Sequence, residues 1–126
     1  MIVVDTSALM AILLGEIDAA RCSERLVAEE RVIISAATLA ETLIVATRKN
    51  VNADVDSFIS LFQIEVEPVT ERLARKTAEA YRAWGKGRNP ASLNYGDCFA
   101  YALAKDLNCP LLFVGDDFSR TDVTAA

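Results

Sequence analysis

Short apolar runs alternate with longer amphipathic stretches along the whole chain. Continuous apolar runs at residues 2–4, 32–34 and 111–114 are typical of parallel strands covered on both faces, and a fourth strand candidate, 64–66, ends at Pro68. Helices are predicted between these strands, at residues 8–14, 18–30, 36–49, 53–62, 70–84 and 95–107. Strands that alternate with helices indicate an α/β fold, in which helices cover both faces of a parallel sheet.

Turn and cap residues mark the ends of these elements. Asp5-Thr6-Ser7 and Ser35 stand where helices begin, and Gly15 ends the first helix. Residues 85–90 are the one loop-like stretch of any length. With 126 residues and no linker, low-complexity tract or internal repeat, residues 1–126 are predicted to form a single domain.

The composition is that of a globular protein, with 52% hydrophobic and 25% charged residues. The apolar runs are far shorter than the ~20 residues of a membrane span, and the N-terminus lacks the basic region of a signal peptide, so a cytoplasmic protein without membrane contact is expected. Cys22, Cys98 and Cys109 have no CxxC spacing and are expected to be reduced, packed residues.

The absence of histidine restricts the chemistry that this chain can perform. A zinc site is nearly excluded, as are the triads, dyads and acid–base pairs that need an imidazole. A net charge of −5 argues against non-specific binding to duplexes through a basic surface. It leaves room for a nuclease, because a cluster of acids that holds cations would itself make the net charge negative.

Two acids follow predicted strands directly. Asp5 comes after the strand 2–4, and Asp116 comes two residues after the strand 111–114. Ligands of open α/β sheets bind at the carboxyl ends of the strands, so both acids are expected at that edge. Asp117 is adjacent to Asp116 and could take the same place.

Two further acids, Glu41 and Asp97, lie on predicted helices among mainly apolar neighbours. The residues three and four positions from Glu41, and likewise from Asp97, include no Lys or Arg to pair with. Unpaired acids on inward helix faces are costly unless they meet a cation.

Each acid also has an ordinary structural alternative. Asp5 could only cap a helix, Glu41 could bond to the backbone or to a distant Arg, Asp97 could be a structural acid near a helix start, and Asp116 could be a turn residue. The agreement of all four acids on a chain without histidine favours a shared site. Oxygen-only ligands suit Mg²⁺ or Mn²⁺, whether one ion or two, and such a site suits phosphodiester hydrolysis.

The motifs around these acids resemble those of PIN-domain ribonucleases, specifically the VapC-type toxins of bacterial toxin–antitoxin pairs. The resemblance spans nearly the whole chain and is carried by four segments: Val3–Leu9, Ala40-Glu41-Thr42, Leu93–Cys98 and Leu112–Phe118. It implies a three-layer α/β/α fold with a central parallel sheet of four or five strands. It also implies a Mg²⁺-dependent endoribonuclease that cleaves tRNA or rRNA, forms a homodimer and is inhibited by a cognate VapB-type antitoxin.

Carried over to this sequence, the resemblance makes Asp5 and Asp97 direct metal ligands, with Glu41 and Asp116 completing the catalytic cluster. Asp117 is the alternative to Asp116, and Thr6 and Ser7 would orient a ligand or bond to the waters of the metal.

Contacts with RNA and with partner proteins are less clear from the sequence. Lys86 and Arg88, with Arg82 before them, lie in or near a Gly-containing loop suited to backbone phosphates. Tyr95 could stack on a base, whereas Trp84 is expected to pack in the core. Four apolar residues are candidates for a dimer or antitoxin surface, or simply for the core: Leu26, Val27, Ile59 and Phe62.

Two other interpretations compete with a ribonuclease. A response-regulator receiver is also a small α/β domain that binds Mg²⁺ through aspartates, but it would carry its paired acids after the first strand. A catalytically silent PIN-like module that binds only RNA or protein would be expected to lack some of the acids, and here none is missing.

Overall fold

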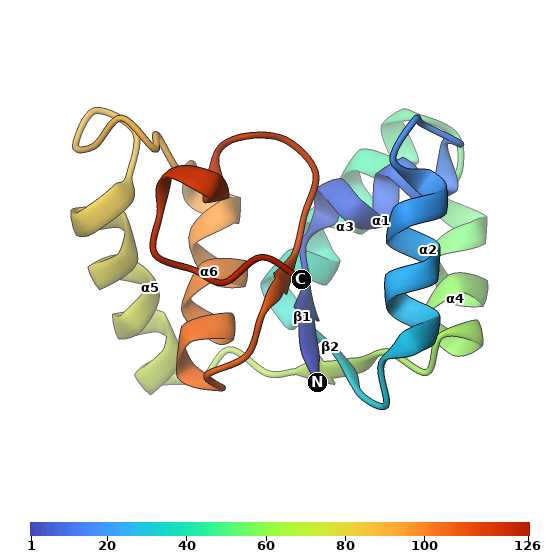
Figure 1. Ribbon diagram of the computed structural model, residues 1–126, viewed down its shortest axis with the longest axis horizontal. Helices are drawn as coiled ribbons and strands as arrows, with labels where there is room; N and C mark the ends of the chain where they lie inside the picture. The colour runs from blue at the N-terminus through green and yellow to red at the C-terminus, as the bar shows by residue number, and fades with distance from the viewer.

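The computed structural model describes all 126 residues as a parallel sheet with helices on both sides (Figure 1). In chain order its elements are β1 (Ile2–Val4), α1 (Thr6–Leu13), α2 (Ala19–Ala28), β2 (Val32–Ser35), α3 (Ala36–Arg48), α4 (Asn52–Leu61), β3 (Glu65–Glu67), α5 (Glu71–Trp84), α6 (Tyr95–Asp106), β4 (Leu111–Leu112) and the 3₁₀ helix η1 (Phe118–Arg120).

The sheet has four parallel strands in the order β3-β2-β1-β4. The short central strand β1 pairs with β2 on one side and with β4 on the other. All three of its residues are fully buried, because alternate side chains enter separate cores on the two faces. The continuous apolar runs of the sequence therefore correspond to strands covered twice, as expected for a parallel sheet.

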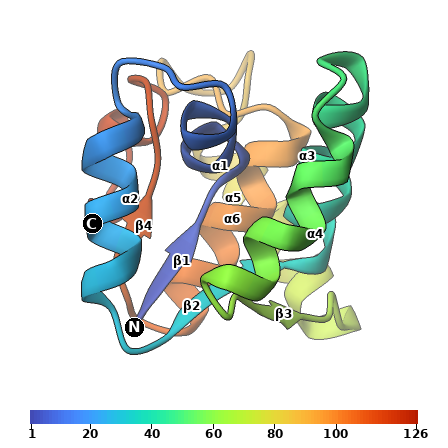
Figure 2. The same ribbon diagram turned by 90° about the vertical axis from the view of Figure 1, so that its right-hand side faces the viewer.

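The two faces of the sheet are covered by different helices. Val3, Ile33 and Leu111 pack with residues of α5 and α6, whereas Ile2, Val4 and Ile34 pack with residues of α1, α2 and α4. Figure 1 shows α5 and α6 on one side of β1 and the other helices opposite, and Figure 2 shows α2, α1 and α4 around the strands. The expected three-layer α/β/α architecture is confirmed.

The two edges of the sheet differ. The side chains of the edge strand β3, Glu65-Val66-Glu67, are all exposed. At the other edge, the backbone of Leu111 bonds to Thr124 and Ala126, so the last residues of the chain run beside β4. This segment covers the edge of β4 without forming a fifth strand, so the sheet has four strands, within the expected four or five.

Most predicted elements agree with the structure to within a few residues, whereas no pattern in the sequence indicated η1. Among the four apolar residues that were candidates for core or surface, Leu26 is buried, Ile59 and Phe62 are partly buried, and Val27 is 75% exposed. All three cysteines are free, and two of them are buried. None of the helices combines the length and apolar character needed to cross a bilayer.

Two strand valines provide a matched test of this architecture. Val3→Ala in β1 removes fully buried methyl groups, so the free energy of unfolding should fall by about 2–3 kcal/mol. Val66→Ala in β3 makes the same chemical change at a side chain that is 43% exposed, and should cost less than about 1 kcal/mol. Equal losses in urea denaturation would contradict the assignment of β1 as the central strand.

Candidate active site

Asp5 lies at the carboxyl end of β1, where it is also the N-cap of α1. One of its oxygens, Oδ2, accepts hydrogen bonds from the backbone amide of Ser7 at 3.0 Å and from the Ser7 hydroxyl at 2.7 Å. The other oxygen, Oδ1, is buried and has no hydrogen-bond partner. Burial raises the pKa of Asp5; the Ser7 bonds oppose this rise and the charge of Glu41 adds to it. The capping role of Asp5 therefore accounts for the hydrogen bonds of Oδ2 and leaves the burial of Oδ1 without an explanation.

Thr6 and Ser7 hold acids in place. The Thr6 hydroxyl donates to Glu41 Oε1 at 2.7 Å and lies 3.0 Å from the Thr42 hydroxyl. The Ser7 hydroxyl donates to Asp5 and accepts a bond of 3.0 Å from the Val114 amide, just after β4. The two hydroxyls therefore orient the carboxylates of Glu41 and Asp5 directly.

Glu41 lies on α3 and reaches the first turn of α6. A Cβ built on Gly96 would overlap Glu41 Oε2, at a separation closer than any real contact of this kind. Glycine at position 96 is therefore what lets the Glu41 carboxylate lie next to Asp97. The sequence did not predict the hydrogen bond that Glu41 accepts from Thr6.

Asp97 is held in the first turn of α6 by a capping box. The Asn94 side chain accepts from the Asp97 amide at 2.8 Å, and Asp97 Oδ2 accepts from the Asn94 amide at 3.1 Å. Partial burial raises the pKa of Asp97 to about 7, against the effect of the Asn94 bond. The charges of Asp5, Asp117 and Glu41 add to the rise, so the four carboxylates share one electrostatic environment.

Asp116 and Asp117 differ in their surroundings. Both follow Gly115, whose φ of +101° is accessible mainly to glycine and turns the chain away from β4. Asp117 is among the charges that contribute most to the raised pKa of Asp97. Asp116 instead lines a shallow pocket of about 300 Å³ together with Asp18 and Arg21 of the α2 region.

The donor set of this edge fits a divalent cation. It combines a buried carboxylate oxygen without a partner, Asp5 Oδ1, with like charges that raise the pKa values of Asp5 and Asp97 and that a cation would relieve. No three acidic side chains converge tightly enough to enclose an ion by themselves. This arrangement suits a cation that takes one or two carboxylates directly and keeps several waters, as Mg²⁺ does.

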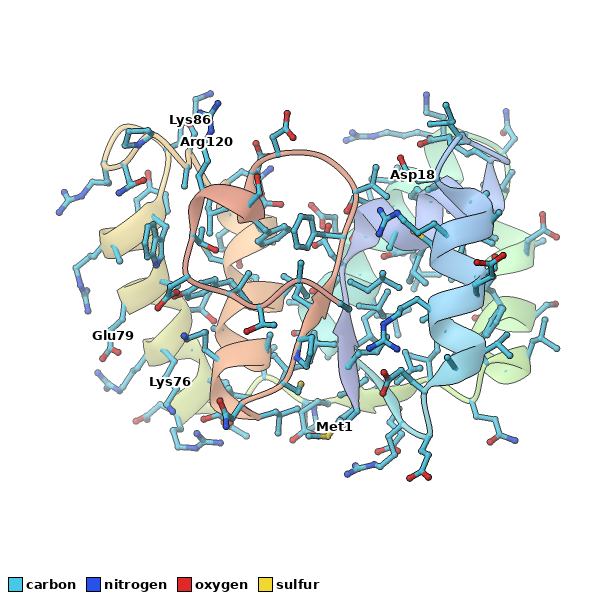
Figure 3. The ribbon with its side chains drawn as sticks, viewed as in Figure 1. Met1, Asp18, Lys76, Glu79, Lys86 and Arg120 are labelled. Atoms are coloured by element: carbon cyan, nitrogen blue, oxygen red, sulfur yellow. The ribbon has the colours of Figure 1, made fainter.

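Four cations without ion-pair partners lie in or near the loop 85–93 and η1. Most of the Lys and Arg side chains on the helices form ion pairs. Arg82, Lys86, Arg88 and Arg120 form none, although all four are exposed. Arg120 donates to the carbonyl of Pro90 at 3.0 Å, which joins η1 to the loop 85–93, and Figure 3 labels Lys86 and Arg120 at the same edge of the molecule. The sequence did not single out Arg120, because it lies 30 residues along the chain from its partner in this loop.

Comparison with known proteins identifies the family. The model of the PIN domain matches residues 2–123. The chain belongs to the PIN-domain family. It is 43% identical to ribonuclease VapC28 of Mycobacterium tuberculosis, over 98% of this chain and 96% of that protein, and 40% identical to ribonuclease VapC30, over 96% and 95%. The resemblance to VapC-type ribonucleases is thus confirmed, and with it the class of RNA-hydrolysing enzyme.

Solved structures of PIN-domain toxins share the fold. VapC20 of M. tuberculosis, described as a toxin that cleaves the sarcin–ricin loop, superposes with a TM-score of 0.81 at 19% identity, covering 100% of this chain and 98% of that one. A toxin–antitoxin complex from Klebsiella pneumoniae gives a TM-score of 0.77 at 16% identity, covering 100% and 97%. Membership of this family excludes the receiver alternative, and PIN-domain ribonucleases are generally dependent on divalent metals.

The close approach of Glu41 to Gly96 gives a prediction in which stability and activity separate. Gly96→Ala should change the free energy of unfolding by less than about 1 kcal/mol, because the helix preference of alanine over glycine, about 0.5–1 kcal/mol, offsets the loss of the hydrogen bond from Thr6 to the displaced Glu41. Cleavage of RNA should fall by about 100-fold, because Glu41 is displaced from the cluster. Thermal unfolding and initial cleavage rates measure the two effects.

A second variant tests whether the effect acts through Glu41. Glu41→Asp shortens the side chain by one methylene, so Gly96→Ala should cost much less activity in that background than in the wild type. Equal losses in the two backgrounds would show that Gly96 acts on something other than Glu41.

The raised pKa of Asp97 predicts a pH dependence of stability in the metal-free protein. Asp97 releases its proton at about pH 4 in the unfolded chain and at about pH 7 in the folded protein. Between these pH values the native state therefore binds more protons than the unfolded state. Stability should therefore fall as the pH rises through this window, and Asp97→Asn should remove this contribution. The measurement is the difference in unfolding free energy between the wild type and Asp97→Asn in EDTA, and a difference independent of pH would contradict it.

Proposed function

We propose that this protein is the toxin of a toxin–antitoxin pair, an endoribonuclease that hydrolyses phosphodiester bonds of tRNA or rRNA at the cluster formed by Asp5, Glu41, Asp97 and Asp117. The observation that carries the proposal is the shared environment of these acids on three separate elements and the loop after β4, next to a buried carboxylate oxygen without a partner. Relatives at 40–43% identity are named ribonucleases, which supports the choice of RNA.

The residues of the cluster have distinct proposed roles. Asp5 Oδ1 and Asp97 bind the cation, since the first has no other partner and the second has a pKa that a cation would lower. Glu41, fixed by Thr6, faces the same space and can hold waters in place. Asp117 is proposed as the fourth acid in place of Asp116, on the support of its coupling to Asp97.

Mg²⁺ is the proposed physiological cation, with Mn²⁺ as a substitute. When bound, such an ion polarises a phosphoryl oxygen and makes hydroxide available from water near neutral pH. The carboxylate oxygens of the cluster and the absence of histidine support this choice over softer metals.

Backbone phosphates of the RNA are proposed to contact Lys86, Arg88 and Arg120. Their lack of ion-pair partners leaves their charge available in the loop 85–93 and on η1, and this loop leads into Asn94, which bonds to Asp97. The other proposed partners are a VapB-type antitoxin, whose tail would enter the acidic groove, and a second copy of this chain in a homodimer. Structural relatives are solved as toxin–antitoxin complexes, and a cytoplasmic location is proposed because the RNA substrates lie there.

The decisive experiment is cleavage of total tRNA and rRNA by the purified protein. Cutting is expected with Mg²⁺ or Mn²⁺ and should stop in EDTA. Asp97→Asn should lower the rate by more than about 100-fold, because even outer-shell partners of a metal contribute about 10–100-fold. A folded wild type that cuts neither RNA with either metal would favour the silent binding module instead.

Two adjacent variants serve as a matched pair in the same assay. Asp117→Asn should reduce cleavage strongly, because Asp117 is among the main charges acting on Asp97, whereas Asp116→Asn should stay near the wild-type rate, because Asp116 lines a pocket with Asp18 and Arg21. The reverse order would restore Asp116 as the fourth acid.

A further inference from the structure

The largest groove on the molecule lies between α5 and α6, outside the acid cluster. Its volume is about 740 Å³, which is in the range of small-molecule sites. Its most distinctive lining residues are Tyr81, Arg82, Lys86, Asn94, Tyr95 and Phe99. No acidic side chain lines it, so it joins aromatic surface to positive charge in a protein of net charge −5.

The aromatic side chains of the groove are held in fixed positions while still reachable. Tyr95 is 78% exposed and lies edge-on to Phe99, with ring centroids 4.9 Å apart. Tyr81 donates its hydroxyl proton to the Lys86 carbonyl, and its ring covers Gly85 so closely that a Cβ there would clash at 2.5 Å. These rings form a preorganised apolar surface with nothing packed on it.

The cationic side chains of this groove form no ion pairs. Arg82 and Lys86 have no ion-pair partner. On another side of the same helix pair, a smaller pocket carries Lys76 and Lys105, and both are paired, with Asp106 and Asp122 respectively. Arg82 and Lys86 are thus free to meet a negatively charged ligand, whereas the two lysines of the neighbouring pocket are neutralised.

The groove adjoins the candidate active site through Asn94. Asn94, which lines the groove, also caps α6 and exchanges two hydrogen bonds with Asp97. A ligand seated against Asn94 and Tyr95 therefore lies next to the turn that carries a catalytic carboxylate.

We propose that this groove binds an unpaired base of the RNA substrate, stacked on the surface formed by Tyr95 and Phe99, while the adjoining phosphates contact Arg82 and Lys86. The inference rests on the proposed ribonuclease function and adds a recognition site to it. Base stacking on aromatic side chains combined with a positively charged track is the usual way in which proteins hold single-stranded RNA. A symmetrical contact between two copies would instead bring two sets of unpaired cations together without an acid in the groove to neutralise them.

The test measures binding without cleavage. A short single-stranded RNA that contains 2-aminopurine is titrated into the protein in EDTA. Stacking should quench its fluorescence, and Tyr95→Ala should remove the quenching and weaken affinity by about tenfold, given the usual contribution of one stacked base. Tyr95→Phe keeps the ring and should behave as the wild type.

Charge variants test the phosphate interactions separately. The double variant Arg82→Ala/Lys86→Ala should reduce the slope of log affinity against log salt by about 0.7 for each phosphate that is no longer neutralised. The matched control is Arg48→Ala/Lys49→Ala at the end of α3, which removes two other exposed, unpaired cations and should leave the slope unchanged.

Several results would overturn the proposal. Unchanged affinity in Tyr95→Ala would do so while leaving the ribonuclease intact, provided that the wild type cuts RNA. A change in sedimentation of Tyr95→Ala with unchanged RNA affinity would assign the groove to contact between two copies, and loss of antitoxin binding alone would assign it to that protein. A wild type that neither cuts nor binds RNA would overturn the proposed function itself.

Discussion

The structure depends on the cost of bringing like charges together at a partly dry edge of a sheet. Asp5 is buried by the same packing that makes β1 the centre of two cores, so its carboxylate cannot move away from Glu41 and Asp97. Several local features offset this cost. Hydroxyls of Thr6 and Ser7 hold two carboxylates, and a capping box holds the third.

These fixed carboxylates come from both layers of the molecule. Glu41 belongs to α3 on one side, while Asp97 belongs to α6, which packs with α5 on the other face of the sheet. The site therefore lies at the seam between the two cores. Rigid elements position all of the acids except the one in the turn after β4, which makes that turn the adjustable part of the site.

The fold and the acids on regular elements could be predicted from the sequence, because apolar period and cap residues act locally. Asp5 and Asp97 are examples, since each lies at a helix start that the sequence marks. The choice between Asp116 and Asp117 could not be predicted, because a turn at Gly115 sends adjacent side chains in different directions. The roles of Gly96 and Arg120 depend on contacts with residues far away in the chain, and no local pattern announces them.

The gathering of unpaired cations in the loop 85–93 and η1 has a consequence for encounter kinetics. This loop lies at one end of the long axis of the molecule. It is thus a local positive region on a protein of net negative charge. Near a polyanion such a region favours approach of the loop before any contact forms, so the rate of productive collisions would depend on ionic strength.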